Sequence, residues 1–333
     1  MSRHTLLFTL LTLLTAVLFL IDLSVGSVAI PLREVWAAVT GGDCPPTTLH
    51  IVREIRLLKT LTAMAAGVAL AVSGLQMQTL FRNPLAGPYV LGISSGAGLG
   101  VALFLLGAPL LGVAGHSFVQ TLGIAGAAWI GAAGVMAVIL LLSRHIKDIL
   151  VMLILGMMFG SAVSALVEIL QYLSDEAALK SFVVWTMGSL GDVTASQLQL
   201  LLPVVGMGLL ISIALIKPLN LLLLGENYAQ TMGLNLHRTR RWLLLSTVLL
   251  AGTITAFCGP IGFVGIAIPH LARMLFASAD HRILLPASML TGASLVLLCD
   301  LISKSLALPI NAITALMGIP IVILVVIRNR HLC

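Results

Sequence analysis

Long apolar runs separated by short polar breaks make up most of this chain. A membrane-spanning helix needs about 20 apolar residues. The runs predict ten spans, at about 5–26, 57–80, 90–107, 119–143, 149–172, 198–216, 242–258, 262–278, 284–303 and 308–327. The runs are continuous, whereas the strands of a membrane β-barrel alternate. The pattern therefore predicts an all-α integral membrane protein with ten transmembrane helices, as one domain over residues 1–333.

Composition supports a membrane protein, because 59% of the residues are hydrophobic and only 9% are charged. Soluble domains carry about 25% charged residues, so a soluble fold is excluded. The first apolar run could also be a signal peptide. It is longer than a usual signal core, and no small-x-small cleavage site follows it, so we interpret it as the first span.

The positive charges indicate the orientation of the spans. With the N-terminus in the cytoplasm, twelve of the 18 Lys and Arg residues lie inside, including Arg144, Lys147 and Arg330. This bias predicts a multi-pass inner-membrane protein with both termini cytoplasmic. It also explains the net charge of +6 without nucleic acid. The remaining six lie outside: Arg33, Arg53, Arg56, Lys59, Lys180 and Lys304.

The sequence contains no recognisable catalytic or metal-binding motif. The four cysteines, at 44, 258, 299 and 333, lack the spacing of a metal site or a disulfide framework. No phosphate-binding GxxxxGK[ST] motif is present either. We predict no catalytic residue, no metal site and no cofactor bound by this chain. If ATP drives it, another chain hydrolyses the ATP.

The first polar break of interest is FRNPLAGP, residues 81–88. Asn-Pro starts turns, and Pro88 is predicted to open the next helix at its first position. One interpretation is a tight cytoplasmic hairpin, with Gln76 and Gln78 forming hydrogen bonds between helices. The other is a constriction, because non-helical backbone near membrane depth is tolerated where it lines a cavity. Beyond it, glycines at 92, 96 and 100 predict close helix packing.

The most polar stretch is the cytoplasmic segment 217–241, in which Gly225 and Gly233 bracket ENYAQTM. It is either a solvated loop or a short helix that docks a cytoplasmic partner. A loop of this length with helical pattern inside is more often functional.

Three ionisable groups within spans suggest a different function. Glu168, His270 and Asp300 could form a relay for an ion-coupled secondary transporter. Each also has an ordinary explanation as a satisfied or snorkelling polar residue, and Asp300 can pair with Lys304 four residues later. An intramembrane enzyme ranks last, because no nucleophile–base set is recognisable.

Four motifs, in order and spacing, resemble the FecCD family of bacterial ABC importer permeases: GVALAVSGLQMQTLFRNPLAGPYVLGISSGAG, GPIGFVGIAIPHLAR, DHRILLPASMLTGASLVLLCD and LPINAITALMGIP. The resemblance implies a type II importer permease without enzymatic activity. It implies pairing with a second copy or a paralogue, and two ATPase subunits that hold ATP and Mg. A periplasmic or lipoprotein binding protein would deliver a metal chelate: iron–siderophore, haem or cobalamin.

The resemblance also implies roles for individual residues. The segment that couples to the ATPase corresponds to 226–236 and comprises Glu226, Tyr228, Ala229, Met232, Gly233 and Asn235. The cytoplasmic gate corresponds to Asn83 and Leu85, and the cations that meet the binding protein to Arg56, Lys59 and Lys304. Lys59 and Lys304 stand where Arg is commoner, which removes bidentate geometry. Ala307 and Asn311 stand where the family has Glu and Gly, which puts the outer end of the last span in doubt.

Overall fold

The structure, a computed structural model, describes residues 3–26, 28–107, 117–142 and 149–329. Within these ranges it is helical and has no strand. Among the described residues, seven helical segments are long and apolar enough to cross a membrane, and three shorter apolar ones accompany them. All ten coincide with predicted spans, and the count of ten crossings stays a prediction. Arg144, Lys147, Arg330 and Cys333 lie outside the described residues.

The helices follow in this order: α1 (Arg3–Ser24), α2 (Leu32–Thr40), α3 (Pro46–His50), η1 (Ile51–Arg56), α4 (Leu57–Leu80), α5 (Ile93–Ala102), η2 (Leu103–Gly107), α7 (Ser117–Leu142), α8 (Ile149–Leu173), α9 (Glu176–Thr186), α10 (Ala195–Ala214), α11 (Ile216–Leu223), α12 (Glu226–Thr231), α13 (Leu236–Thr247), η3 (Val248–Gly252), α14 (Thr253–Cys258), α15 (Val264–Phe276), α16 (His281–Leu306) and α17 (Ile310–Asn329). The η segments are π-helical and continue their neighbours, so η3 joins α13 and α14 into one long span.

Helix α4 runs through the middle of the bundle and is buried along most of its length. Its neighbours approach very closely. An added Cβ at Gly67 would lie 2.2 Å from the carbonyl oxygen of Gly292 in α16, and one at Gly74 would lie 1.7 Å from that of Gly265 in α15. Side-chain-free positions therefore fix how α15 and α16 pack on α4.

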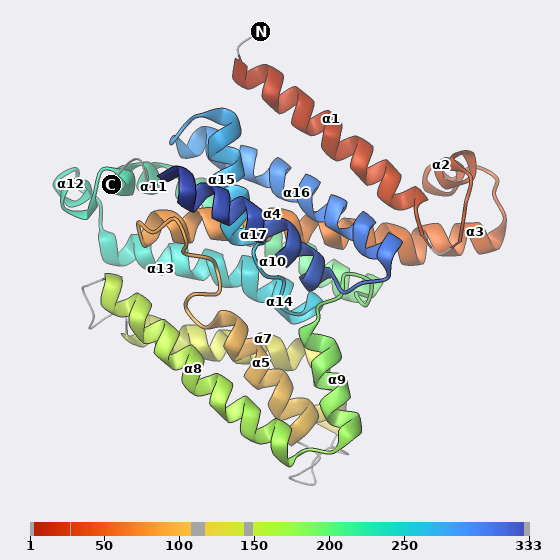
Figure 1. Cartoon of the computed structure of the whole chain (residues 1–333), viewed down its shortest axis with the longest axis horizontal. Helices are drawn as coiled ribbons and strands as arrows, with labels where there is room; N and C mark the ends of the chain where they lie inside the picture. Colours follow the sequence, from red (N-terminus) through yellow and green to blue (C-terminus); the bar gives the residue numbers. More distant parts are fainter. Residues whose placement is uncertain (1–2, 27, 108–116, 143–148, 330–333) are drawn as a thin grey trace.

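Figure 1 shows two groups of helices. Helices α4, α10, α15, α16 and α17 lie together, with α1 along the outside of α16, and α5, α7, α8 and α9 form the second group. The buried apolar side chains likewise fall into two main clusters. Helices α11 and α12 lie at one end of the molecule and α2 and α3 at the other. We call these the α12 end and the α2 end.

The glycine-rich start of α5 differs in part from its prediction. Gly96 and Gly100 do pack tightly, because a Cβ on either would meet α7 backbone at Gly131 or Ala127. Gly92, however, precedes the helix in a left-handed conformation with φ of 76°. The prediction that Pro88 opens this helix is wrong, because turns continue to Gly92 and α5 begins at Ile93. Pro88 instead packs against Gly265.

Candidate functional site

The polar segment at the α12 end contains the short helix that its sequence suggests. Gly225, at φ of 104°, turns the chain into α12, and Gly233, at φ of 84°, turns it out again. Asn235 then caps α13, because its side-chain oxygen accepts the N–H of Arg238 at 3.0 Å. The two glycines adopt backbone conformations that other residues rarely reach, and together with Asn235 they define the bounds of the segment.

The α12 segment packs one face against the protein and exposes the side chains of the other face. Ala229 is fully buried, whereas Tyr228 is 51% and Met232 60% exposed. Arg240 of α13 donates from one terminal nitrogen to both carboxylate oxygens of Glu226, at 2.6 and 2.8 Å. The arrangement fixes α12 on α13 and presents an aromatic ring and a thioether outward.

The predicted gate is an ordered turn. The N–H of Leu85 donates to the side-chain oxygen of Asn83 at 2.9 Å, which is the local hydrogen bond that makes Asn favourable in turns. Leu85 is 45% exposed. Arg82 begins the turn in a left-handed conformation with φ of 46°, so the chain leaves α4 abruptly.

Two side chains of α15 hold the gate turn and the end of α4 in place through hydrogen bonds. His270 donates from Nε2 to the carbonyl oxygen of Pro84 at 2.7 Å, since a carbonyl can only accept. Arg273 donates to the side-chain oxygen of Gln78 at 2.7 Å, and Gln78 donates to the Ile266 carbonyl at 3.0 Å. His270 is thus a satisfied polar residue. The predicted interhelical role of Gln78 is confirmed.

Gln76, two residues before Gln78 on α4, also confirms its predicted role. Its amide nitrogen donates to Ser212 of α10 at 2.7 Å and to Ser246 of α13 at 3.1 Å. Its oxygen accepts from Thr247 at 3.2 Å. The last two turns of α4, which lead into the gate, are therefore tied to three other helices.

The gate turn and the α12 segment are neighbours, although about 140 residues separate them in sequence. A cleft of about 490 Å³ lies between Arg82 and residues 224–228. The terminal nitrogen of Arg82 comes within 3.7 Å of a Cβ position at Gly225. The structure thus brings together the two segments to which the resemblance assigned coupling and gating.

A second connection between these regions was not predicted. Asn220 of α11 accepts the backbone N–H of His281 at 2.9 Å and donates to Asp280 at 2.6 Å. The ring of His281 contacts the Thr79 hydroxyl at 2.9 Å. Hydrogen bonds from the Arg282 backbone N–H and from Asn220 lower the pKa of Asp280 below its ordinary value. The available sequence signal was Asp280 as a cap before an apolar run.

A buried ionic cluster lies toward the α2 end. Lys304 contacts Asp22 of α1 and Asp300 of its own helix, each at 2.8 Å, and Lys59 contacts Asp300 at 3.2 Å. The Thr60 hydroxyl donates to Asp22 at 2.6 Å. The predicted pair of Asp300 and Lys304 is confirmed. Asp22, which is completely buried, was missed; an acid at the end of an apolar span was the signal.

The three cations predicted to meet a binding protein point into the protein to different degrees. The terminal nitrogens of Arg56 donate to the backbone carbonyls of Leu23, Ser24 and Val28, and Arg56 is 5% exposed. The side chain of Lys304 is 9% exposed and that of Lys59 is 23% exposed. Arg56 and Lys304 already have partners within the chain, and Lys59 is the most accessible. Their docking role stays a prediction.

The proposed ion relay is not assembled. Glu168 is an exposed residue of α8, His270 bonds to the gate turn, and Asp300 pairs with two lysines toward the opposite end. The three groups lie on three different helices, and His270 and Asp300 have separate partners.

The two family positions that are altered both have structural consequences. Asn311 accepts the N–H of Gly262 through its side chain at 2.9 Å, and its own N–H donates to Met187 at 3.3 Å. It thereby ties the start of α17 to two loops at the α2 end. Ala307 ends α16 in a left-handed conformation, with φ of 53°.

Comparison with known proteins agrees with this architecture. The FecCD transport family matches residues 14–328. The hemin transport system permease protein HmuU of Yersinia pestis is 37% identical, over 96% of this chain and 95% of that protein. The vitamin B12 import system permease protein BtuC of Klebsiella pneumoniae is 40% identical, over 96% and 93%. The molybdate import system permease protein MolB of Haemophilus influenzae is 36% identical, over 93% and 92%.

A solved structure is similar over nearly the whole chain. It is described as an inward-facing conformation of a metal-chelate type ABC transporter. The TM-score is 0.84 and the identity 33%, over 97% of this chain and 99% of that one.

Proposed function

This chain belongs to the FecCD transport family, and we propose that it is the permease subunit that moves a bulky metal chelate across the inner membrane in an ABC importer powered by partner ATPases. The observation that carries the proposal is the contact region at the α12 end, where an exposed short helix lies beside the gate turn. A permease without a nucleotide-binding motif needs such a surface, because the movement that drives transport has to be transmitted to it from an ATPase chain.

Coupling begins, under this proposal, at the exposed face of α12. Tyr228 and Met232 insert into the ATPase, because large exposed apolar side chains anchor protein interfaces. Glu226 and Arg240 transmit the movement of α12 to α13. Residues 226–236 then act as a rigid lever and not as a flexible loop.

The gate proposal concerns Asn83 and Leu85. Leu85 projects from the turn and is 45% exposed, so it provides an apolar plug at the cytoplasmic exit. The His270 and Asn83 hydrogen bonds give the turn one defined shape. Alternating access would move the turn as a unit together with α15.

The outer partner would approach the α2 end. Lys59 is the best placed of the three predicted cations, since its side chain is the most exposed. A Lys59→Glu variant is expected to weaken association with the binding protein, and more so at low salt. Lys180→Glu, on exposed α9, is the matched control. Equal affinities for both variants would remove Lys59 from the interface.

The transported substrate is proposed as a class. Relatives are named for hemin, vitamin B12 and molybdate import, and the resemblance added iron–siderophores. The molybdate relative widens the set from metal chelates to a metal oxyanion. A direct assay therefore has to include all four.

The test is uptake by proteoliposomes that contain this chain, its ATPase and its binding protein. We expect ATP-dependent accumulation of one of the four substrates. Tyr228→Ala should abolish both uptake and co-purification of the ATPase. Tyr172→Ala, which removes a tyrosine that is 89% exposed on α8, should leave both intact. Uptake that continues without the ATPase, or none of the four substrates being moved, would refute the proposal.

A further inference from the structure

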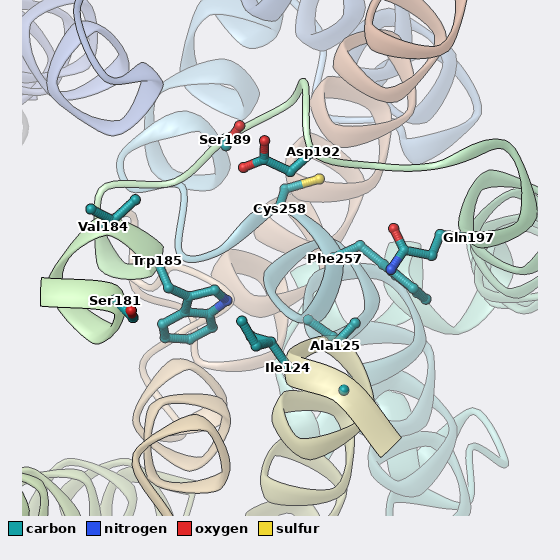
Figure 2. Close-up of a pocket in the computed structure, with 12 residues that line it drawn as sticks. Ile124, Ala125, Ser181, Val184, Trp185, Ser189, Asp192, Gln197, Phe257 and Cys258 are labelled. Atoms are coloured by element: carbon teal, nitrogen blue, oxygen red, sulfur yellow. The ribbon is translucent and has the colours of Figure 1, made fainter. Parts of the chain in front are cut away.

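A pocket of about 420 Å³ opens at the α2 end between α7, α9, α10 and α14. Figure 2 shows Trp185 of α9 on one side of it, Asp192 and Ser189 from the following loop at a second side, and Gln197 of α10 opposite Trp185. Neither the coupling segment nor the gate turn contributes to it. It is therefore a separate site.

The pocket contains polar groups that lack protein partners. The indole Nε1 of Trp185 is buried and has no hydrogen-bond partner among the described residues. A buried donor without an acceptor costs free energy that a ligand can recover. Gln197 uses its side-chain oxygen to accept the Thr194 N–H at 3.1 Å, so its NH₂ group remains as a donor. Asp192 adds an exposed carboxylate.

Apart from Ser181 and Ser189, the other side chains that line the pocket are apolar. Ile124 and Phe257 form the wall that faces the indole nitrogen in Figure 2. Outside the pocket, Leu200 of α10, three residues after Gln197, is 59% exposed. The hydrogen-bonding groups Trp185 and Gln197 thus lie near the end of α9 and the start of α10, and an exposed apolar side chain follows along α10.

We propose that this pocket binds the head group of a zwitterionic phospholipid with a primary ammonium. The phosphate accepts hydrogen bonds from Trp185 and Gln197, and the ammonium pairs with the Asp192 carboxylate. The acyl chains follow Leu200 along α10. Trp is typical of the membrane–water interface. An acceptor reaches the indole N–H by displacing Ile124, which is 37% exposed.

The charges distinguish this ligand from other lipids. Two hydrogen-bond donors and one carboxylate around the same pocket match a group with one negative and one positive end. Phosphatidylglycerol has the same phosphate but places a neutral glycerol where the ammonium would lie, so it has no positive charge to pair with Asp192. The quaternary ammonium of phosphatidylcholine carries no N–H to donate to Asp192. Recognition should therefore favour phosphatidylethanolamine over phosphatidylglycerol and phosphatidylcholine.

The test is competition among these three lipids for the purified full chain, followed by native mass spectrometry of retained lipid. The wild type should retain phosphatidylethanolamine roughly tenfold better than phosphatidylcholine. Trp185→Phe keeps the ring, removes the N–H and should weaken retention about fivefold. Asp192→Asn should remove the preference over phosphatidylglycerol. Trp129→Phe and Asp43→Asn are matched controls, because the Trp129 N–H already donates to Thr253 and Asp43 is exposed on a distant loop.

Each other outcome overturns the proposal. Equal retention of the three lipids by the wild type would show that the pocket does not discriminate among their head groups, whatever the variants do. Equal competition by soluble glycerophosphoethanolamine would identify a free head group and not a lipid as the ligand. A change of oligomeric mass in Trp185→Phe without lipid preference would identify a second copy of the chain as the occupant. All of these readouts are independent of transport.

Discussion

Replacement of Lys304 by Met tests whether the ionic cluster at the α2 end holds the fold together. The ammonium of Lys304 lies 2.8 Å from both Asp22 and Asp300, whose side chains are 0% and 1% exposed. In the variant, Asp300 still has Lys59 at 3.2 Å, whereas Asp22 retains only the hydroxyl of Thr60. Removing one partner of a buried ion pair costs about 3–5 kcal/mol, because a buried charge is left uncompensated.

We therefore expect Lys304→Met to lower the free energy of unfolding by about 3–5 kcal/mol, measured by denaturant titration in detergent micelles. Asp22→Asn in the same chain should restore much of the loss, since Asn retains a hydrogen bond to Thr60 without a charge. A double-mutant cycle isolates this coupling. Lys180→Met, at an exposed position of α9, should change stability by less than about 0.5 kcal/mol.

A different result would refute the reasoning. If Lys304→Met were as stable as the wild type and instead bound the outer binding protein more weakly, Lys304 would be an interface residue. A double variant no more stable than Lys304→Met alone would also refute the reasoning, because the loss would then not come from the uncompensated charge of Asp22.

Three further predictions concern backbone and caps. Gly74→Ala should destabilise the fold by at least about 2 kcal/mol, because its Cβ would lie 1.7 Å from the Gly265 carbonyl oxygen, while Gly98→Ala, with open space around it, should be near neutral in the same thermal unfolding assay. The lowered pKa of Asp280 contributes stability that is present above about pH 4 and is lost as the pH falls through its folded pKa; Asp280→Asn should therefore lower Tm at pH 7, and its difference from the wild type should shrink as the pH falls below about 4. Ala277→Gly should raise stability by about 0.5–1 kcal/mol, because Ala277 caps α15 with φ of 49°; an unchanged or lower Tm would contradict this.

The spans could be predicted because lipid imposes a simple rule on the sequence. A run such as 57–80 is continuous and apolar, and α4 occupies those residues. The start of α5 could not be predicted equally well. Pro88 satisfies the local preferences of a first helical position, but its ring packs against Gly265, about 180 residues away, and the turn continues to Gly92. A tertiary contact overrode the local signal.

The candidate site shows the same division. The bounds of α12 followed from Gly225 and Gly233, which act locally. For Lys304, the pair with Asp300 could be predicted from the i,i+4 spacing. The second partner could not, since Asp22 meets Lys304 only because α1 packs along α16, nearly the whole chain away. The resemblance implied an external partner for Lys304, and the structure shows two partners for it within the chain, Asp22 and Asp300.

Under the proposed function, two connections carry movement from the α12 end to the gate. One is direct, through Arg82 beside Gly225. The other runs through Asn220 of α11, which holds the start of α16 and the His281 ring against Thr79 of α4. Both routes converge on the last turns of α4. Displacement of α12 therefore acts on the gate turn directly and also on the end of α4 from which the turn starts. A turn held at both places has to move as a rigid unit, which suits alternation between two defined states better than graded opening.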